Sequence, residues 1–285
     1  MTDPSGPGTA VAPELPFSHL TRRLFINAPF ERLQQDLLKV FIDNRLQPEI
    51  GLEGNCLYEN NEKDFLKIAR ALKKAGLACT VHAPFCDLAP GASDKGILEA
   101  TRNKLLRAFD LIEIFEPVAI VCHLGYEANK HSYRQDEWLA NSIETWQEML
   151  TVAELHQTTI NLENTYETSP DQHLEVLSKL DSPLVRFCLD VGHVMSFAGN
   201  TWQDWLTPLA PWLGQLHLHD NLGDGDHHLA IGKGDFDFTG LFSFLRNRDH
   251  RPLITLEPHL EEGLWESLHA LESMELPKPP HSITT

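Results

Sequence analysis

The strongest constraint on the fold is a regular alternation between short apolar or β-branched runs and longer segments with helical spacing. Eight runs have the composition of buried strands, and each is followed by a segment with apolar residues three or four positions apart. Strands are expected at 22–28, 49–54, 78–84, 118–125, 158–164, 184–193, 214–220 and 252–259. Helices are expected at 31–43, 62–75, 100–115, 134–157, 170–181, 201–212, 237–248 and 262–274. Because parallel strands need crossover connections and closure removes sheet edges, the pattern predicts an α/β fold, a single-domain (β/α)8 TIM barrel.

The alternative architecture is an open, doubly wound parallel sheet. Its nucleotide-binding form has no support, because the chain lacks G-x-G-x-x-G after the first expected strand and lacks G-x-x-x-x-G-K-[ST]. The expected barrel covers 17–275, between a Pro- and Gly-rich N-terminal extension at 1–16 and a C-terminal tail at 276–285, both expected to be flexible. The length of 285 residues fits one such domain.

Cysteine usage and hydropathy bear on location. The five cysteines are scattered without a C-x-x-C pair, which fits reduced thiols better than a disulfide framework. The chain has no apolar stretch of the roughly 20 residues that a transmembrane helix needs and no signal-peptide pattern at its start. We therefore expect a cytoplasmic protein with no membrane partner, and the sequence leaves its oligomeric state open.

Ionisable side chains gather where six consecutive expected strands end. In strand order they are His82, His123, Glu163, Asp190 followed by His193, His217 with His219, and Glu257. Active sites of such barrels lie at the C-terminal ends of the strands. Crowded buried carboxylates and imidazoles cost several kcal/mol each unless they are paired or bind a cation, so the pattern predicts a divalent metal site. Residues two apart share a strand face, so the pattern alone does not choose between His217 and His219 as the ligand.

The end of the seventh expected strand and the loop after it add further donors. Positions 217–228 carry four histidines and three aspartates: His217, His219, His227, His228, Asp220, Asp224 and Asp226. Asp, Asn and Gly also cluster in solvated turns, which is the alternative interpretation of this stretch. Imidazole nitrogens and carboxylate oxygens are ligands that divalent metals take, so we expect part of the loop to complete the metal site.

Seven short motifs in this order carry a resemblance to a known family. They are VHAPF (81–85), CHLG (122–125), NLEN (161–164), CLDVGH (188–193), LHLHD (216–220), DHHLAIGKGDFDF (226–238) and TLEP (255–258). Each is generic alone, and their order and placement at strand ends make the set specific. On these motifs the chain resembles the xylose isomerase-like TIM-barrel superfamily, which includes sugar isomerases and epimerases and the endonuclease IV-like nucleases, AP endonuclease family 2.

The resemblance implies as many as three cation positions, filled by one to three zinc or manganese ions per chain. His82, His123 and Glu163 would form the first; Glu163, Asp190, His217 and Glu257 the second; His193, Asp226 and His228 the third. The Gly232-Lys233-Gly234 turn fixes the register that selects Asp226 and His228 over Asp224 and His227. His219, Asp220 and His227 then become supporting or loop residues. Phe85, His219 and Lys233 are the expected substrate-binding residues.

Two chemistries follow from the resemblance. In a sugar or sugar phosphate isomerase or epimerase, the ion polarises an α-hydroxy carbonyl, and Glu163 and Glu257 are the catalytic acid and base on a small polyhydroxylated substrate. In a multinuclear zinc hydrolase, three ions activate water against a small-molecule phosphoester or amide, with cobamide remodelling among the cases. His228 departs from the arginine common in ketose epimerases. A barrel that binds a metal or ligand without turnover is the third possibility.

The formal net charge of −18 argues against nucleic acid as a partner, because such a chain repels polyanions. The residues after the third strand agree. Endonuclease members usually carry a Tyr and a nearby Asn there, and this chain reads Phe85-Cys86-Asp87-Leu88. DNA repair is therefore the least favoured specific function, and a small-molecule substrate is the expected partner.

Overall fold

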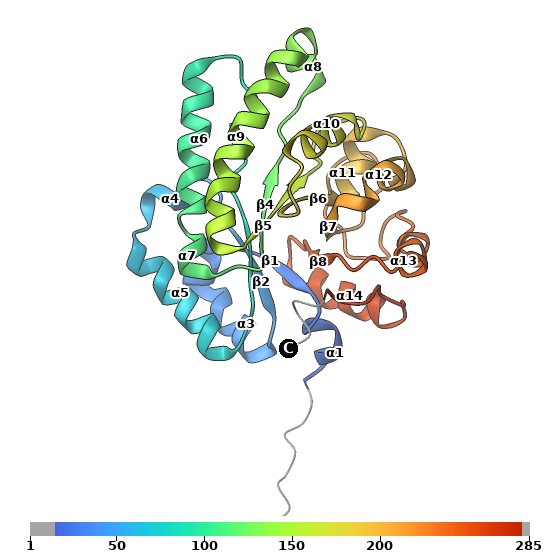
Figure 1. Cartoon of the computed structure of the whole chain (residues 1–285). Helices are drawn as coiled ribbons and strands as arrows, with labels where there is room; N and C mark the ends of the chain where they lie inside the picture. The colour runs from blue at the N-terminus through green and yellow to red at the C-terminus, as the bar shows by residue number, and fades with distance from the viewer. Residues whose placement is uncertain (1–14, 281–285) are drawn as a thin grey trace, which may run out of the picture.

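Eight parallel strands close into a barrel in sequence order, which confirms the predicted TIM barrel. The structure is a computed structural model that describes residues 15–280. The strands are β1 (Phe25–Pro29), β2 (Gln47–Gly51), β3 (Thr80–His82), β4 (Ala119–His123), β5 (Thr159–Glu163), β6 (Val185–Asp190), β7 (Leu213–Leu218) and β8 (Leu253–Leu256). β8 pairs with β1, so no strand of the barrel is left as an edge. Figure 1 shows the strands at the centre with helices around them.

Helices connect successive strands on the outside of the barrel. The helical segments are α1 (Ser18–Thr21), α2 (Phe30–Arg32), η1 (Leu33–Leu37), α3 (Leu38–Asn44), α4 (Cys56–Glu59), α5 (Glu62–Ala75), α6 (Lys95–Phe109), α7 (Ile112–Phe115), α8 (Ala128–His131), η2 (Ser132–Arg134), α9 (Gln135–His156), α10 (Asp171–Leu180), α11 (Val191–His193), η3 (Val194–Ala198), α12 (Trp202–Leu209), η4 (Ala210–Trp212), α13 (Phe238–Asn247) and α14 (Glu261–Glu272). The long helices α5, α9, α13 and α14 match predicted helices within a few residues.

Most predicted boundaries shift by a few residues, and three of the differences have local reasons. The predicted helix at 100–115 is two helices, because α6 ends at Phe109 before the short α7 begins at Ile112. The predicted helix at 201–212 ends as a 3-10 turn that contains Pro211, whose ring cannot donate a backbone hydrogen bond. The sixth strand ends at Asp190, and Val191–His193 form a helical turn rather than strand.

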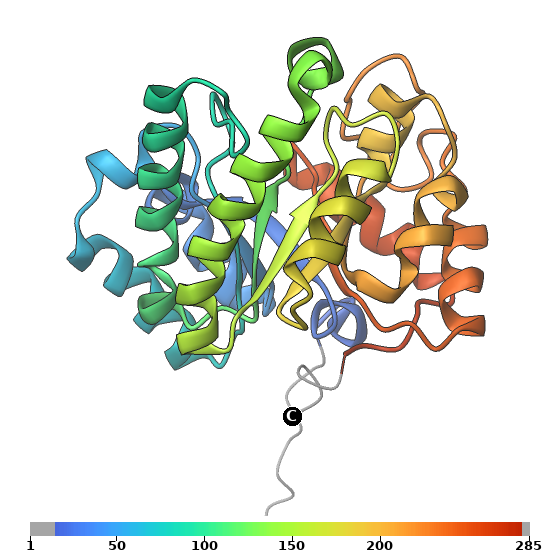
Figure 2. The ribbon, with the colours of Figure 1, turned by 45° about the horizontal axis from the view of Figure 1, so that its top comes forward.

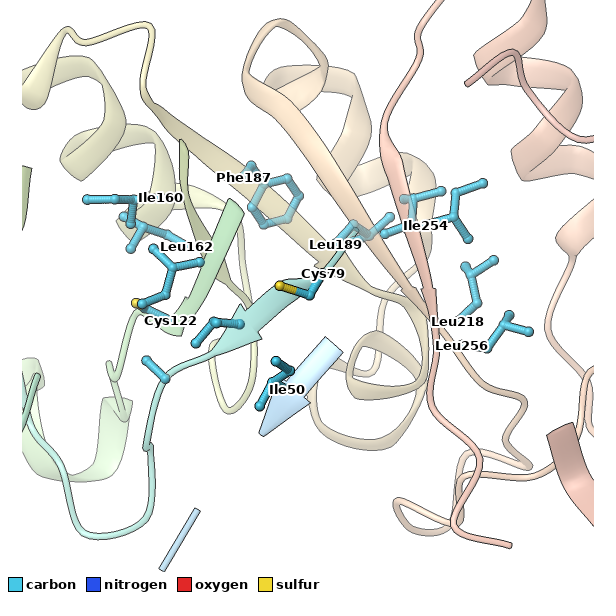
Figure 3. Packing of buried hydrophobic residues seen from close by; sticks show 14 of the residues in the cluster. Ile50, Cys79, Cys122, Ile160, Leu162, Phe187, Leu189, Leu218, Ile254 and Leu256 are labelled. Atoms are coloured by element: carbon cyan, nitrogen blue, oxygen red, sulfur yellow. The ribbon is translucent and has the colours of Figure 1, made fainter. Parts of the chain in front are cut away.

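Period-2 alternation along the strands separates an apolar shell from a polar lumen. On β5, Ile160 and Leu162 are fully buried in the apolar core, with Phe187 and Leu189 of β6 nearby, as Figure 3 shows. The alternate residue Asn161 instead donates its side-chain amide to Gln215 Oε1 of β7 across the lumen, at 2.7 Å. The same alternation carries Glu163, the last residue of β5, into the mouth of the barrel.

The two ends of the barrel differ. Helix α8 rises above one end, whereas α1 and the described C-terminal residues lie at the opposite end (Figures 1 and 2). Most of the predicted N-terminal extension (1–14) and half of the predicted tail (281–285) lie outside the described residues. Within the described part of that tail, Leu276 is buried against the core and the Pro277 carbonyl accepts from Arg23. Among residues 15–280, no helix is long and apolar enough to cross a membrane.

Candidate metal centre

A cavity of about 1080 Å³ lies at the C-terminal ends of the strands, where the sequence placed the site. Phe85 lines it, with its ring stacked on His123 at 4.4 Å between centroids. His219 lies beneath the cavity wall with 1% exposure. Lys233 is not among the described residues that line the cavity, and its ammonium faces Glu266 of α14 at 3.5 Å. The structure therefore brings Phe85 to the cavity and Lys233 to the outer surface, and the substrate roles of all three remain predictions.

Glu163 stands at the centre of the site and faces two groups of histidines with its two oxygens. Oε2 lies 3.1 Å from His82 Nε2 and 3.3 Å from His123 Nε2. Oε1 lies 3.2 Å from His217 Nδ1, and that nitrogen is also 3.0 Å from Glu257 Oε1 and 3.9 Å from Asp190 Oδ2. The carboxylate of Glu163 is 1% exposed. It thus occupies the bridging position that the resemblance implies between the first and second groups.

The third predicted group also converges. Asp226 Oδ2 lies 3.2 Å from His228 Nε2 and 3.5 Å from His193 Nε2. His219 is close by, with its Nε2 3.9 Å from Asp226 Oδ1 and its ring stacked parallel on that of His228 at 3.8 Å. All nine predicted ligands therefore meet in three adjoining groups, with Glu163 shared between the first two.

The spacing of these atoms suits a divalent ion. Two ligands about 2.0–2.2 Å from one tetrahedral ion lie about 3.3–3.6 Å from each other. The contacts in the three groups run from 3.0 to 3.9 Å. Asp226 Oδ1 is buried and has no hydrogen-bond partner among the described residues, so it is available to a cation. Buried carboxylates and imidazoles in this number are what borderline divalent metals bind.

The backbone orients three of the imidazoles in the same way. His82 Nδ1 lies 2.9 Å from the carbonyl oxygen of Ala83, His193 Nδ1 lies 2.9 Å from that of Asn164, and His228 Nδ1 lies 3.0 Å from that of Glu257. In each ring an Nδ1–H that donates to the carbonyl leaves Nε2 free to accept a cation. Each ring has a carboxylate of its ligand group beside Nε2: Glu163 for His82, and Asp226 for His193 and His228. His193 Nδ1 also lies 3.4 Å from Glu163 Oε1.

His82 and His123 face the same oxygen of Glu163, yet their pKa values move in opposite directions. Burial disfavours the charged form of both rings. For His82 the hydrogen bond to Glu163 and the charge of that carboxylate outweigh burial and raise the pKa to about 9. For His123 burial prevails and lowers the pKa. Without a cation one ring thus holds a proton against Glu163, and because ligating histidines are neutral, a bound divalent ion would replace that proton.

Asp190 links β6 to the helical turn that carries His193. Its backbone N–H donates to Asn164 Oδ1 at 2.9 Å, and its side chain accepts the backbone N–H of His193 at 2.7 Å. Gly192 lies directly against His219, where a Cβ atom would come within 1.9 Å of the His219 ring. Glycine at this position therefore allows the ring of His219 to reach Asp190, whose carboxylate oxygens lie 3.1 and 3.2 Å from its Nε2.

The loop after β7 is folded around Asp220, which is 1% exposed. Its carboxylate accepts the backbone N–H groups of Asn221 and Gly232, both at 2.9 Å, and of Phe236 at 3.1 Å. Gly232 adopts a positive φ of 86°, which favours glycine. A Cβ atom at Gly234 would lie 2.3 Å from the Asn221 carbonyl oxygen. The G-x-G turn thus holds the loop in the register that brings Asp226 and His228 to the site.

Two buried carboxylates belong to this region but were not predicted from the sequence. Glu49, in β2, is 1% exposed and lies 2.9 Å from His217 Nε2. Its signal was an acidic residue at the head of the apolar run EIGLEG (49–54). Glu167 lines the cavity and accepts backbone N–H groups from Thr165 and Tyr126. Burial, partly offset by these hydrogen bonds, raises the pKa of Glu167 to about 7.

Comparison with known proteins agrees with this architecture. The MJ1311 protein of Methanocaldococcus jannaschii is 30% identical over 189 residues, which are 62% of this chain and 63% of that protein, so the match spans less than two thirds of that relative. A D-tagatose 3-epimerase-like protein of known crystal structure has a TM-score of 0.75 at 23% identity, covering 87% of this chain and 96% of that one. The TTHB071 protein from Thermus thermophilus, soaked with ZnCl2, has a TM-score of 0.73 at 24% identity, covering 88% and 97%.

A match to a family model assigns the chain to a protein family. The model described as xylose isomerase-like TIM barrel matches residues 49–274, from β2 through the last helix of the barrel. This range contains all nine predicted ligands and both additional carboxylates. The chain belongs to the xylose isomerase-like TIM-barrel family.

Proposed function

We propose that this protein is a divalent-metal-dependent sugar isomerase or epimerase that acts on a small polyhydroxylated substrate. The observation that carries the proposal is the position of two carboxylates from different strands. Glu163 Oε1 and Glu257 Oε1 lie 3.2 and 3.0 Å from the same atom, His217 Nδ1, and both residues line the cavity. Each can therefore contact both a metal ion and a substrate that occupies the cavity. Its neighbour in fold, the D-tagatose 3-epimerase-like protein, supports the same class of reaction.

The roles of the residues follow from their places. When bound, a divalent ion supplies Lewis acidity that polarises a carbonyl and its adjacent hydroxyl. Glu163, Asp190, His217 and Glu257 would hold it. One of the two glutamates takes the proton from the carbon beside the carbonyl, and the other returns a proton. Return to the former carbonyl carbon, with the proton of the adjacent hydroxyl passing to the former carbonyl oxygen, gives isomerisation. Return to the opposite face of the same carbon gives epimerisation. The glutamate that returns a proton starts protonated and ends ionised, and the other glutamate does the reverse, so atoms and charge balance.

The charge of the cavity favours an uncharged sugar over a sugar phosphate. Lys130 is the one lysine or arginine among the described residues that line the cavity, and its ammonium is 2.6 Å from Glu127. Acidic residues in the lining include Glu53, Asp87 and Asp94, outside the ligand groups. A phosphate placed there finds no free cationic side chain among these lining residues to bind it. The ring of Phe85, stacked on His123, offers an apolar wall for the carbon face of a sugar.

We also propose that the enzyme works in the cytoplasm. The support is the state of its thiols: all five cysteines are free, and Cys86 is exposed. An exposed unpaired thiol suits a reducing compartment.

The proposal is tested with the metal-loaded protein against a panel of free ketoses and aldoses and their phosphates, in deuterated water. We expect turnover of a free sugar with deuterium incorporated at the reacting carbon, and a lower kcat/KM for its phosphate. Glu163→Gln and Glu257→Gln should both lose turnover, because an amide neither takes nor returns the proton. Glu148→Gln, at an exposed position of α9, is the matched control. Full activity of Glu163→Gln, or turnover without deuterium incorporation, contradicts the proposal.

A multinuclear zinc hydrolase is the second candidate, and one observation favours it. The group of His193, Asp226 and His228 converges although one-ion chemistry does not use it. Three ions could activate water and stabilise charge on a phosphoester or amide. Elemental analysis separates the candidates: one ion per chain supports the isomerase, and three support the hydrolase. His228→Ala should reduce activity only moderately in the first case and abolish it in the second.

A further inference from the structure

His217 is oriented the opposite way from the other histidines of the centre. In His82, His193 and His228, Nδ1 lies 2.9–3.0 Å from a backbone carbonyl oxygen, and Nε2 faces a carboxylate, that of Glu163 or Asp226. In His217, Nδ1 faces Glu163 and Glu257, and Nε2 points to the other side of the ring. The partner of Nε2 there is Glu49 Oε1 at 2.9 Å, a carboxylate from β2 on the far side of the lumen.

Glu49 is itself fixed by contacts from three further strands. Its Oε2 accepts the hydroxyl of Thr80 at 2.7 Å, the side-chain amide of Gln215 at 2.6 Å and the hydroxyl of Thr255 at 3.1 Å. Gln215 is anchored in turn by Asn161, whose amide donates to Gln215 Oε1 at 2.7 Å. The carboxylate therefore has one orientation, with Oε2 held by neutral donors and Oε1 directed at His217.

Carboxylates lie beside both ring nitrogens of His217, and Glu49 is the one beside Nε2. Gln215 Nε2 lies 3.4 Å from His217 Nε2, but its two hydrogens are taken by Glu49 and by Thr255, whose Oγ1 is 2.9 Å away. An ionised carboxylate can only accept, and Glu49 Oε1 has no other hydrogen-bond partner among the described residues, so His217 Nε2, 2.9 Å away, is the donor available to it. With the Nε2–H directed at Glu49, a cation between Glu163, Asp190 and Glu257 would take the place of a proton on Nδ1 and bind its lone pair.

We propose that Glu49 is the positioning residue of the metal centre: it fixes the tautomer and ring plane of His217 and strengthens its nitrogen as a ligand. The inference rests on the metal centre of the proposed function and not on which reaction occurs there. Glu49 is not among the described residues that line the cavity, so it is placed to act through His217 and not on a substrate. A carboxylate behind a ligating histidine makes the ring a better donor than a carbonyl does. This role also explains why a charged residue is buried in the lumen at position 49, where burial of an apolar residue would cost less free energy.

The test compares zinc affinity, by competition with a chromophoric chelator, in wild-type protein, Glu49→Gln, Glu49→Asp and Glu167→Gln. The last is the matched control, because Glu167 is equally buried but hydrogen-bonds backbone groups instead of a ligand. We expect Glu49→Gln to weaken zinc binding by about 10- to 100-fold, as loss of such an outer partner does. Glu49→Asp should recover part of the loss, and Glu167→Gln should stay within about threefold.

A second measurement needs no variant of Glu49. Proton–nitrogen correlation spectra of the zinc-loaded wild-type protein should show a slowly exchanging Nε2–H on His217, assigned by its absence in His217→Gln. A proton on Nδ1 instead, wild-type zinc affinity in Glu49→Gln, or no zinc binding by the wild-type protein each overturns the inference. Zinc binding with the expected Glu49 effect but without sugar turnover contradicts the proposed reaction and leaves the role of Glu49 intact.

Discussion

Asp220 offers a measurable link between the fold of one loop and the metal centre. Its buried carboxylate accepts the N–H groups of Gly232 and Phe236, which lie far along the loop that carries Asp226 and His228. Replacing Asp220 by Ala removes both acceptors and leaves these donors without partners. The loop should loosen, and the third ligand group should lose its geometry before the group on β3, β4 and β5 does.

The expected loss in free energy of unfolding follows from the two hydrogen bonds to Gly232 and Phe236. A hydrogen bond to a charged group contributes about 1.5–3 kcal/mol, so two of them give about 3–6 kcal/mol, and the side chain is too buried for solvent to screen them. We expect Asp220→Ala to lower the free energy of unfolding by about 4 kcal/mol. Asp220→Asn keeps one oxygen acceptor and should cost about 1–3 kcal/mol. The third contact, to the adjacent Asn221, closes no loop and is left out of the sum.

The assay is denaturant unfolding of each variant, combined with elemental analysis of the metal that stays bound after gel filtration. Asp224→Ala is the control, because Asp224 lies in the same loop and its side chain, which is 73% exposed, pairs with His227 at the surface. It should change the unfolding free energy by less than about 0.5 kcal/mol. If Asp220→Ala unfolds within about 1 kcal/mol of the wild type and keeps its full metal content, the reasoning about this loop is wrong.

Three further predictions concern the packing of the site, a buried histidine of α10 and metal binding. Gly192→Ala should displace the ring of His219 and reduce zinc affinity, since the new methyl group would lie 1.9 Å from that ring; a crystal structure with His219 unmoved would refute this. Burial lowers the pKa of His173 to about 3 in the folded protein, whereas this histidine titrates near pH 6.5 in the unfolded chain. As the pH falls below about 6.5, the unfolded chain therefore takes up a proton that the folded protein does not, and stability is lost. His173→Phe, between Phe187 and Trp205, should reduce the slope of unfolding free energy near pH 5 by about 1.4 kcal/mol per pH unit, and an unchanged slope would exclude His173 as its source. Chelation of the metal should lower Tm, and readdition at about 1,000 times Kd should restore about 4 kcal/mol of stability; equal Tm values with and without chelator would count against a resident ion.

The architecture was predictable because strand and helix periodicities differ and alternate without interruption along the chain. Parallel β5 shows the principle: its residues Ile160 and Leu162 supply the apolar shell, and Glu163 marks the strand end. Boundaries were less predictable. The helical turn at Val191–His193 continues an apolar strand pattern in sequence, whereas in the structure the side chain of Asp190 caps this turn by accepting the backbone N–H of His193.

Some residues of the candidate site could likewise be predicted from the sequence, and others could not. Donors that end a strand, such as His82 and Glu257, could be placed from sequence because the topology sends every strand end to one rim. Glu49 could not, because its role depends on which lumen residue of β7 faces it, and that follows from the packing of the whole barrel. The sequence predicts a substrate-binding role for His219, which the contacts do not test, but it does not predict the contact of His219 with the carboxylate of Asp190, which needs a residue without a side chain at Gly192.

Glu163 also has a thermodynamic consequence. Its two oxygens are rigidly joined, so any rotation that improves the fit of one to His82 and His123 moves the other relative to His217. If ions occupy both of the first two positions, their binding is therefore linked, and an ion at one would change the affinity of the other by the same factor in both directions. Loading curves would then be those of a coupled pair, in which neither position has a dissociation constant of its own.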